Sequence, residues 1–175
     1  MPTPLPTPLN ATQASLLGFL HEGPKTGWDL LDEVSRGLRR FWNVTSSHVY
    51  RELKTLEELD LIEAAGEPGP RDRQPFKITR AGRRAFAHWL RQEPAPEQIR
   101  VPLLVTLWFG KHLDDDVLAG FIANQRAEHE RRVGDYRALI GATVECDEHM
   151  RSVVEFGIAY EEAFLGWLNA LPYSR

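Results

Sequence analysis

The 175-residue chain has a single cysteine, Cys146, and no apolar run near the roughly 20 residues that a membrane helix needs. One cysteine builds neither a disulfide framework nor a four-cysteine metal site, so we expect a protein of the reducing cytoplasm. Residues 1–8 are rich in Pro and Thr and lack the basic start and apolar core of a signal peptide. They predict a short disordered lead.

The sequence also lacks the short motifs of common enzymes. It has no Gly-rich phosphate loop, no G-x-S-x-G turn and no H-E-x-x-H pair. Carboxylates are plentiful, but no pair is isolated in apolar surroundings. We therefore predict a protein that is not an enzyme and that needs no cofactor.

Two clusters look like metal sites but have plainer explanations. The aspartates at 114–116 precede a helical pattern, where carboxylates satisfy free backbone amides and complement the helix dipole. Cys146, Glu148 and His149 form no known closed tetrahedral set. We expect no metal site.

Charge is unevenly distributed along the chain. The net charge is −4, but residues 35–92 contain 12 Lys/Arg against 7 Asp/Glu, whereas residues 93–175 contain 8 against 14. Affinity for a polyphosphate depends on the local field and not on the total charge. The pattern permits DNA binding in the first half without proving it.

Good N-cap residues mark four helix starts in the first half: Asn10, Thr26, Thr45 and Thr79. Asn10 also has Gln13 three positions on, which is a capping-box pattern, and Thr26 has Asp29 at the same spacing. Apolar residues at helical spacing follow each start. Those of the third helix are Val49, Leu53, Leu56 and Leu59, and those of the fourth are Ala85, Phe86 and Trp89.

Two short strands and a loop complete the pattern. Residues 61–65 and 76–78 predict strands, and the Gly/Pro-rich segment 66–75 between them predicts a loop. Three helices followed by a strand, a loop and a strand is the order of a winged helix-turn-helix. We therefore predict a winged-helix DNA-binding domain over 9–92.

The exposed side of the third helix is the main candidate for DNA contacts, because small and basic side chains there can reach phosphates and base edges in a major groove. The second-helix start, where free amides can bind phosphate, and the wing supply further candidates. The predicted DNA-binding residues are Thr26, Trp28, Ser46, Ser47, His48, Tyr50, Arg51, Lys54, Arg71, Arg73 and Lys77. Most have a plainer alternative: a cap and a core aromatic for Thr26 and Trp28, a soluble loop for the wing arginines, and solvated helix surface for Ser46, Ser47, His48, Arg51 and Lys54. For Tyr50 the two interpretations combine, with the ring packed on the core and the hydroxyl reaching phosphate.

A stiff Pro-containing linker over 93–97 separates a wholly helical second half, 98–175. Pro102 fits the first turn of a short helix, the aspartates at 114–116 start a long helix to about residue 140, and a last helix follows. Gln125 and His129 interrupt the apolar stripe of the long helix, and Glu161 is the polar member of the seam on the last helix. The two stripes exceed what one small domain can cover, so we expect a homodimer. The predicted interface residues are Leu118, Ile122, Val133, Tyr136, Ile140, Val154, Ile158, Leu165 and Leu168.

Residues 14–90 resemble the DNA-binding domain of the PadR family of transcriptional regulators. The matching segments are LLGFL at 16–20, GPKTGWDL at 23–30, SHVYRELKTLE at 47–57, LI at 61–62 and ITRAG at 78–82. Members commonly have Tyr where this chain has Trp28, and often Gly where it has Asp60, a residue that tolerates a left-handed helix end better than most. LVTLWFG at 104–110 and WL at 167–168 resemble the long-helix dimerisation domain of the larger subfamily.

The resemblance implies a fold that is mainly α with a small β wing, comprising a winged helix-turn-helix and a long-helix dimerisation domain. It also implies a homodimer on a palindromic operator, usually a repressor, often released by a small aromatic effector. Trp89, Trp108, Phe109 and Phe121 could line an effector pocket between the domains, although core packing is the commoner role of such residues. Two alternatives remain: a winged-helix protein-interaction module, which the sequence pI of about 5.9 favours, and a small-ligand or metal-handling protein.

Overall fold

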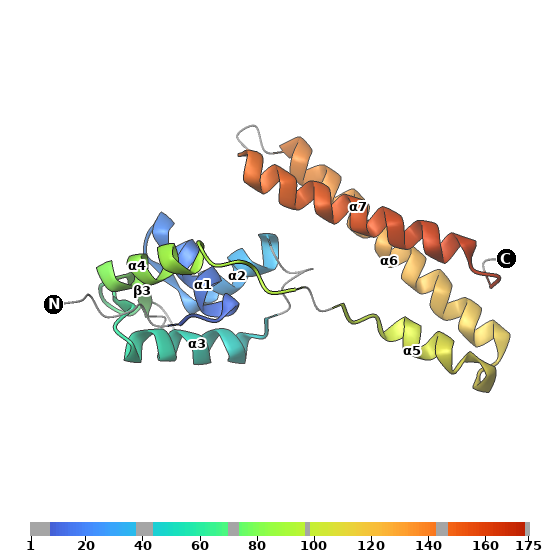
Figure 1. Ribbon diagram of the computed structural model, residues 1–175, viewed down its shortest axis with the longest axis horizontal. Helices are drawn as coiled ribbons and strands as arrows, with labels where there is room; N and C mark the ends of the chain where they lie inside the picture. The colour runs from blue at the N-terminus through green and yellow to red at the C-terminus, as the bar shows by residue number, and fades with distance from the viewer. Residues whose placement is uncertain (1–7, 38–43, 70–73, 97–98, 143–146, 174–175) are drawn as a thin grey trace. The chain divides into compact units, whose positions relative to one another are not determined.

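The computed structural model describes residues 8–37, 44–69, 74–96, 99–142 and 147–173 (Figure 1). The chain divides into two compact units, Met1–Glu97 and Gln98–Arg175. Most of the expected lead, together with Arg71, Arg73 and Cys146, lies outside the described residues. No helix in the described part of the chain has the length and apolar character needed to cross a membrane.

The first unit has the element order of a winged helix. Its elements are α1 (Ala11–Phe19), a 3-10 turn (Leu20–Glu22), β1 (Lys25–Thr26), α2 (Gly27–Gly37), α3 (Ser46–Glu58), β2 (Ile62–Ala64), β3 (Pro75–Ile78) and α4 (Arg80–Trp89). The fold class is therefore confirmed for this half: helices predominate, and the strands form one small antiparallel sheet.

The predicted N-caps are present and explain where the helices begin. Asn10 accepts a hydrogen bond from the Gln13 amide at 2.8 Å, and the Gln13 side chain accepts one from the Asn10 amide at 3.0 Å. Thr26 and Asp29 exchange the same pair of bonds at the start of α2. Thr45 and Thr79 cap α3 and α4 through the amides three positions on. Each cap satisfies a backbone donor that has no partner inside its helix.

The sheet has the strand order β1-β3-β2, with β3 in the centre. Ile62 pairs with Ile78 and Ala64 with Phe76 on one side of β3, while Lys25 pairs with Phe76 on the other. The sequence predicted β2 and β3 but not β1. Two residues are too few to show an alternating pattern, and only pairing with β3 makes them a strand.

The end of α3 is set by Asp60, which has a positive φ of 55°. The Asp60 amide donates to the Glu57 carbonyl, and the Leu61 amide donates to the Leu56 carbonyl. This is the hydrogen-bond pattern of a Schellman motif, in which glycine usually occupies the left-handed position. Asp60 therefore adopts the conformation that the resemblance implied for this position.

The core of the first unit lies between α1, α3 and the sheet. Val49, Leu53 and Leu56 are all at most 2% exposed and pack in one cluster with leucines of α1. Leu59 was expected on the same stripe, but it is 40% exposed. The expectation was wrong because Leu59 is the C-cap of α3, where the backbone already turns away from the helix.

The second unit contains α5 (Pro102–Trp108), a 3-10 turn (Gly110–His112), α6 (Asp115–Ala142) and α7 (Glu148–Ala170). α6 and α7 run side by side as a helical hairpin (Figure 1). Gly157 of α7 allows the close approach, because a β-carbon there would come within 2.6 Å of the Tyr136 ring on α6. The long helices therefore pack on each other within one chain.

This packing buries most of the residues expected at the dimer interface, which stays a prediction. Six of the nine expected residues are buried inside the single chain, so they have little surface left for a second copy. They are Leu118, Ile122, Val133, Tyr136, Val154 and Leu168. Ile140, Ile158 and Leu165 are half-buried. The apolar stripes were identified correctly, but these six residues are covered by other helices of the same chain. For Leu118, Ile122 and Leu168 the cover includes Leu103 of α5.

A buried polar pair lies in the seam between α6 and α7. The His129 side chain forms a hydrogen bond through Nδ1 with Glu161, and the two side chains are 4% and 2% exposed. The His129 ring also stacks on Phe164 with ring centroids 4.1 Å apart, and Arg132 lies 3.8 Å from the second Glu161 oxygen. Glu161 is the polar seam member that the sequence indicated, and its partner is His129.

We expect His129→Leu to lower the free energy of unfolding by about 3 kcal/mol, because it leaves a buried carboxylate with only a distant arginine. The double variant His129→Leu/Glu161→Leu should recover most of that loss, since no unpaired charge remains. Urea unfolding followed by circular dichroism measures both. A single variant that costs less than about 1 kcal/mol would contradict the pairing.

Candidate nucleic-acid interface

The outward face of α3 carries the predicted DNA-contact residues. Ser46 and Ser47 are exposed, and the Arg51 and Lys54 side chains are 68% and 77% exposed. Lys54 lies 3.8 Å from Glu58, and at this exposure such an ion pair is weak. Because Val49 and Leu53 are buried on the opposite side, the helix keeps its polar side free for a ligand.

Tyr50 lies beside the start of α2. Its ring contacts the backbone of Gly27, where a β-carbon would come within 2.5 Å of it, while half of the residue remains exposed. The ring therefore packs against the protein, and the sequence had not indicated that Gly27 makes room for it. Trp28, which follows Gly27 in the sequence, is 53% exposed. Two large aromatic residues thus lie on the surface where α2 begins.

The α2 start and the wing flank this face. The Thr26 hydroxyl accepts from the Asp29 amide at 3.2 Å and also bonds the Asp29 carboxylate at 2.7 Å. Thr26 therefore acts as a cap, which was the plainer alternative. On the wing, Lys77 of β3 is exposed and pairs with Glu63 of β2 at 3.1 Å.

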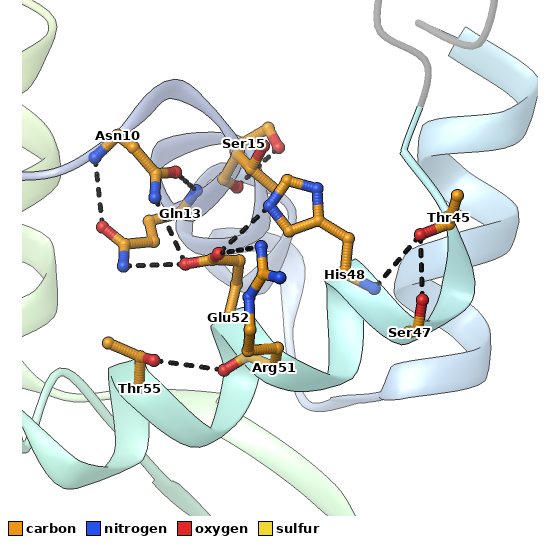
Figure 2. A network of polar contacts seen from close by, with 10 residues as sticks. Asn10, Gln13, Ser15, Thr45, Ser47, His48, Arg51, Glu52 and Thr55 are labelled. Carbon is orange, nitrogen blue, oxygen red and sulfur yellow. Dashed lines mark hydrogen bonds and ion pairs between the residues drawn. The ribbon is translucent and has the colours of Figure 1, made fainter.

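A buried carboxylate lies directly beneath the α3 face (Figure 2). Glu52 is 6% exposed. Its Oε2 accepts from Asn10 Nδ2 at 3.2 Å and Gln13 Nε2 at 2.9 Å, and its Oε1 bonds His48 Nε2 at 3.1 Å and Arg51 Nη2 at 3.2 Å. The capping box of α1 and two candidate DNA contacts therefore share one carboxylate. We call these five residues, Asn10, Gln13, His48, Arg51 and Glu52, the Glu52 cluster.

Sequence reasoning overlooked Glu52 as a functional residue. The signal was nevertheless present, since Glu52 follows Val49 by three positions and precedes Leu56 by four, which places it on the edge of the buried stripe. A charged residue at such a position needs partners. Neither amide donor could be assigned to it from the sequence, because both belong to a helix about 40 positions away.

Burial raises the pKa of the Glu52 carboxyl, but the hydrogen bonds from Asn10, Arg51 and Gln13 and the charge of His48 together hold that pKa below its usual range. The folded protein therefore binds the ionised carboxylate in preference to the protonated form. Glu52 acts as a fixed negative charge at neutral pH.

The candidate effector residues belong to different units. Trp89 of α4 lines an apolar groove of about 420 Å³ between α1 and α4, with Phe86 and Gly18 among its neighbours. Trp108, Phe109 and Phe121 of the second unit are 83%, 55% and 45% exposed. A shared effector pocket stays a prediction. In the part of the chain that the structure describes, no group of three or more His, Cys, Asp or Glu residues could hold a metal ion.

Comparison with protein families matches both units. Residues 16–88 match the transcriptional regulator PadR-like family, and residues 99–171 match the family described as virulence activator alpha C-term. The negative transcriptional regulator PadR of Bacillus subtilis is 21% identical, with 90% of this chain and 93% of that protein covered.

Solved structures share the fold. The crystal structure of Bacillus subtilis PadR with operator DNA is 20% identical, with a TM-score of 0.76 and 94% and 97% of the two chains covered. The structure of the same protein with p-coumaric acid is 20% identical, with a TM-score of 0.69 and 92% and 96% covered. At these identities the likeness establishes the fold over nearly the whole chain.

The low pKa of Glu52 predicts how stability depends on pH. A carboxyl whose pKa is lower in the folded state adds stability above its unfolded pKa of about 4.3, and the stability is lost as the pH falls through the folded value. The wild-type protein should therefore exceed Glu52→Gln in free energy of unfolding near neutral pH, and by less toward pH 3. Urea unfolding at several pH values measures this difference. A difference independent of pH would contradict the ionised state of Glu52.

Proposed function

Because the chain belongs to the PadR-like family of transcriptional regulators, we propose that it binds double-stranded operator DNA by placing α3 in the major groove. The observation that carries this proposal is that α3 has two different faces. Its apolar face is buried, and the face that carries Ser, Arg and Lys side chains is exposed. Ser46, Ser47 and Lys54 contact the DNA directly. Arg51 and His48 contact it from the Glu52 cluster.

Residues outside α3 extend the proposed contact. Trp28 and Tyr50 meet the phosphate backbone near the start of α2, where Thr26 serves as the cap. Lys77, with Arg71 and Arg73, contacts the backbone that flanks the groove. Such contacts orient the protein on the duplex but carry no sequence information.

The proposed active form is a homodimer on a palindromic operator, with recognition helices about 34 Å apart. Its support in this chain is an apolar surface around α5 that stays exposed among the described residues of the second unit. Trp108 is 83% exposed, Val105 61%, Phe109 55% and Leu104 52%. Clusters of this kind on a stable protein mark surfaces that another molecule covers. We assign this surface to the second copy, in place of the six residues buried inside the second unit.

The proposed action is repression in the cytoplasm, with release by a small aromatic effector and no catalytic step. Bacillus subtilis PadR has been solved with p-coumaric acid, which supports this class of effector. Trp89, in the groove between α1 and α4, is the proposed effector contact. Of the other three candidates, Trp108 and Phe109 belong to the proposed dimer surface, and Phe121 stays a prediction. An effector releases DNA only if it binds better to a dimer whose recognition helices no longer match the operator spacing.

The alternative is a winged-helix module that binds another protein through the acidic second unit and does not contact DNA. Salt separates the two proposals. DNA affinity must fall steeply between 50 and 200 mM salt because bound counterions are released from the phosphates. Selection of bound fragments from genomic DNA by the purified protein is the most direct test. Recovery of one palindromic sequence supports the regulator.

We expect Arg51→Ala to weaken operator binding by about 1–3 kcal/mol while the dimer stays intact. If Lys54 contacts only phosphate, Lys54→Ala should reduce the slope of log affinity against log salt by about one. Fluorescence anisotropy on labelled operator measures both. Arg151→Ala, at an exposed arginine of the second unit, is the matched control and should bind like wild type. Wild-type affinity of the two α3 variants would refute these assignments.

We expect Trp108→Glu to dissociate the dimer, because it puts a charge into the proposed apolar interface. The side chain is almost fully exposed in the single chain, so folding should be preserved. Sedimentation velocity measures the assembly. Trp28→Glu, at the exposed tryptophan of the other unit, is the matched control and should remain dimeric. A dimeric Trp108→Glu protein would move the interface away from α5.

A further inference from the structure

Glu52 has an unusual position for an acidic residue. It lies on the helix that we propose to enter the major groove, one residue from Arg51, yet it is 6% exposed. An acidic group beneath a DNA-facing surface opposes attraction to phosphate. Its buried position with four hydrogen-bond partners therefore points to a function that a neutral residue would not perform.

The two oxygens of Glu52 have separate tasks. Oε2 accepts from the side-chain amides of Asn10 and Gln13, whose own oxygens complete the capping box of α1. Because those oxygens are occupied by backbone donors, the NH₂ groups of both residues must point at Glu52. The carboxylate is thereby anchored to the first turn of α1, and it cannot rotate freely.

The other oxygen, Oε1, holds two side chains of the proposed DNA contact. His48 Nε2 and Arg51 Nη2 lie 3.1 and 3.2 Å from it (Figure 2). The Arg51 side chain is otherwise 68% exposed, and a guanidinium has five donors, so one bond to Glu52 does not exhaust its capacity. An anchored acceptor therefore limits the orientations of Arg51 and His48 before any DNA arrives.

We propose that Glu52 is a positioning residue that sets the DNA selectivity of α3. It pre-orders Arg51 and His48 for one arrangement of base edges, and its negative charge weakens binding to arbitrary sequences. The inference rests on the proposed function. A purely structural pin between α1 and α3 is the competing explanation, and it would affect operator and arbitrary DNA alike.

Glu52→Gln separates the two explanations. Removing the charge should tighten binding to a mixed-sequence duplex about threefold, because one negative charge near the phosphates is gone. Operator binding should weaken about tenfold, because Arg51 and His48 must then be ordered on binding. The ratio of operator to mixed-sequence affinity should therefore fall about thirtyfold. A structural pin predicts an unchanged ratio.

The matched control is Glu58→Gln on the same helix. Glu58 is an exposed carboxylate, 63% exposed in its side chain, and it lies near Lys54 and outside the Glu52 cluster. Glu58→Gln removes the same charge and should tighten binding to both duplexes by a similar factor. A second variant, Asn10→Ser, keeps a good N-cap but loses the amide donor to Glu52. It should lower the affinity ratio about threefold even if Glu52→Gln folds poorly.

The experiment uses full-length protein, the duplex selected by wild type from genomic fragments and a mixed-sequence duplex of equal length. Fluorescence anisotropy gives both dissociation constants at 50 and 200 mM salt, and circular dichroism checks folding. The test compares the ratio of operator to mixed-sequence affinity between variants. This inference alone is overturned if the ratios for Glu52→Gln and Asn10→Ser both lie within twofold of the ratio for Glu58→Gln. A wild-type protein that does not discriminate between the duplexes overturns the proposed function and the inference together.

Discussion

Burial of the apolar face of α3 is the constraint on which the DNA-facing surface depends. Val49, Leu53 and Leu56 are buried among the leucines of α1, and this burial holds the rotation of α3 about its own axis. Fully burying a leucine or valine contributes about 1.5–3 kcal/mol, so turning the helix by even one residue would be expensive. The outward direction of Arg51 and Lys54 is a consequence of that cost.

Hydrogen bonds orient individual side chains on α3, which apolar burial alone does not do. Hydrophobic packing sets which side of α3 faces outward, but it does not direct individual side chains on that side. The bonds that Glu52 accepts from Asn10 and Gln13 of α1, and from His48 and Arg51 of α3, supply this direction. The same four bonds offset the cost of burying a carboxylate. Stability and the proposed selectivity therefore draw on one cluster.

Local signals in the sequence predicted the helices of the first unit well. Asn10, Thr26, Thr45 and Thr79 mark their starts because capping is an interaction across only three residues. Features that depend on distant partners were not predictable in this way. β1 exists only through pairing with β3, and the burial of Glu52 depends on amides of α1.

The second unit shows a different limit of sequence reasoning. Apolar spacing identified Leu118, Ile122 and Tyr136 as residues that need cover, and they are covered. Periodicity does not say whether the cover belongs to the same chain or to another copy. The exposed residues around α5 form no long apolar stripe in the sequence, although they include Trp108, the most exposed large apolar residue in the described part of the chain.

One shared residue joins the wing to the second helix. Thr26 pairs with Pro75 of β3 and is also the residue whose hydroxyl caps α2. The length of the hairpin loop can change without disturbing this joint, because the loop lies beyond the paired residues. An inserted residue inside 75–78 would exchange the faces of Phe76 and Lys77 and displace the strand that carries the cap. Evolutionary variation in wing length should therefore be confined to the hairpin tip, with the paired segment constant in length.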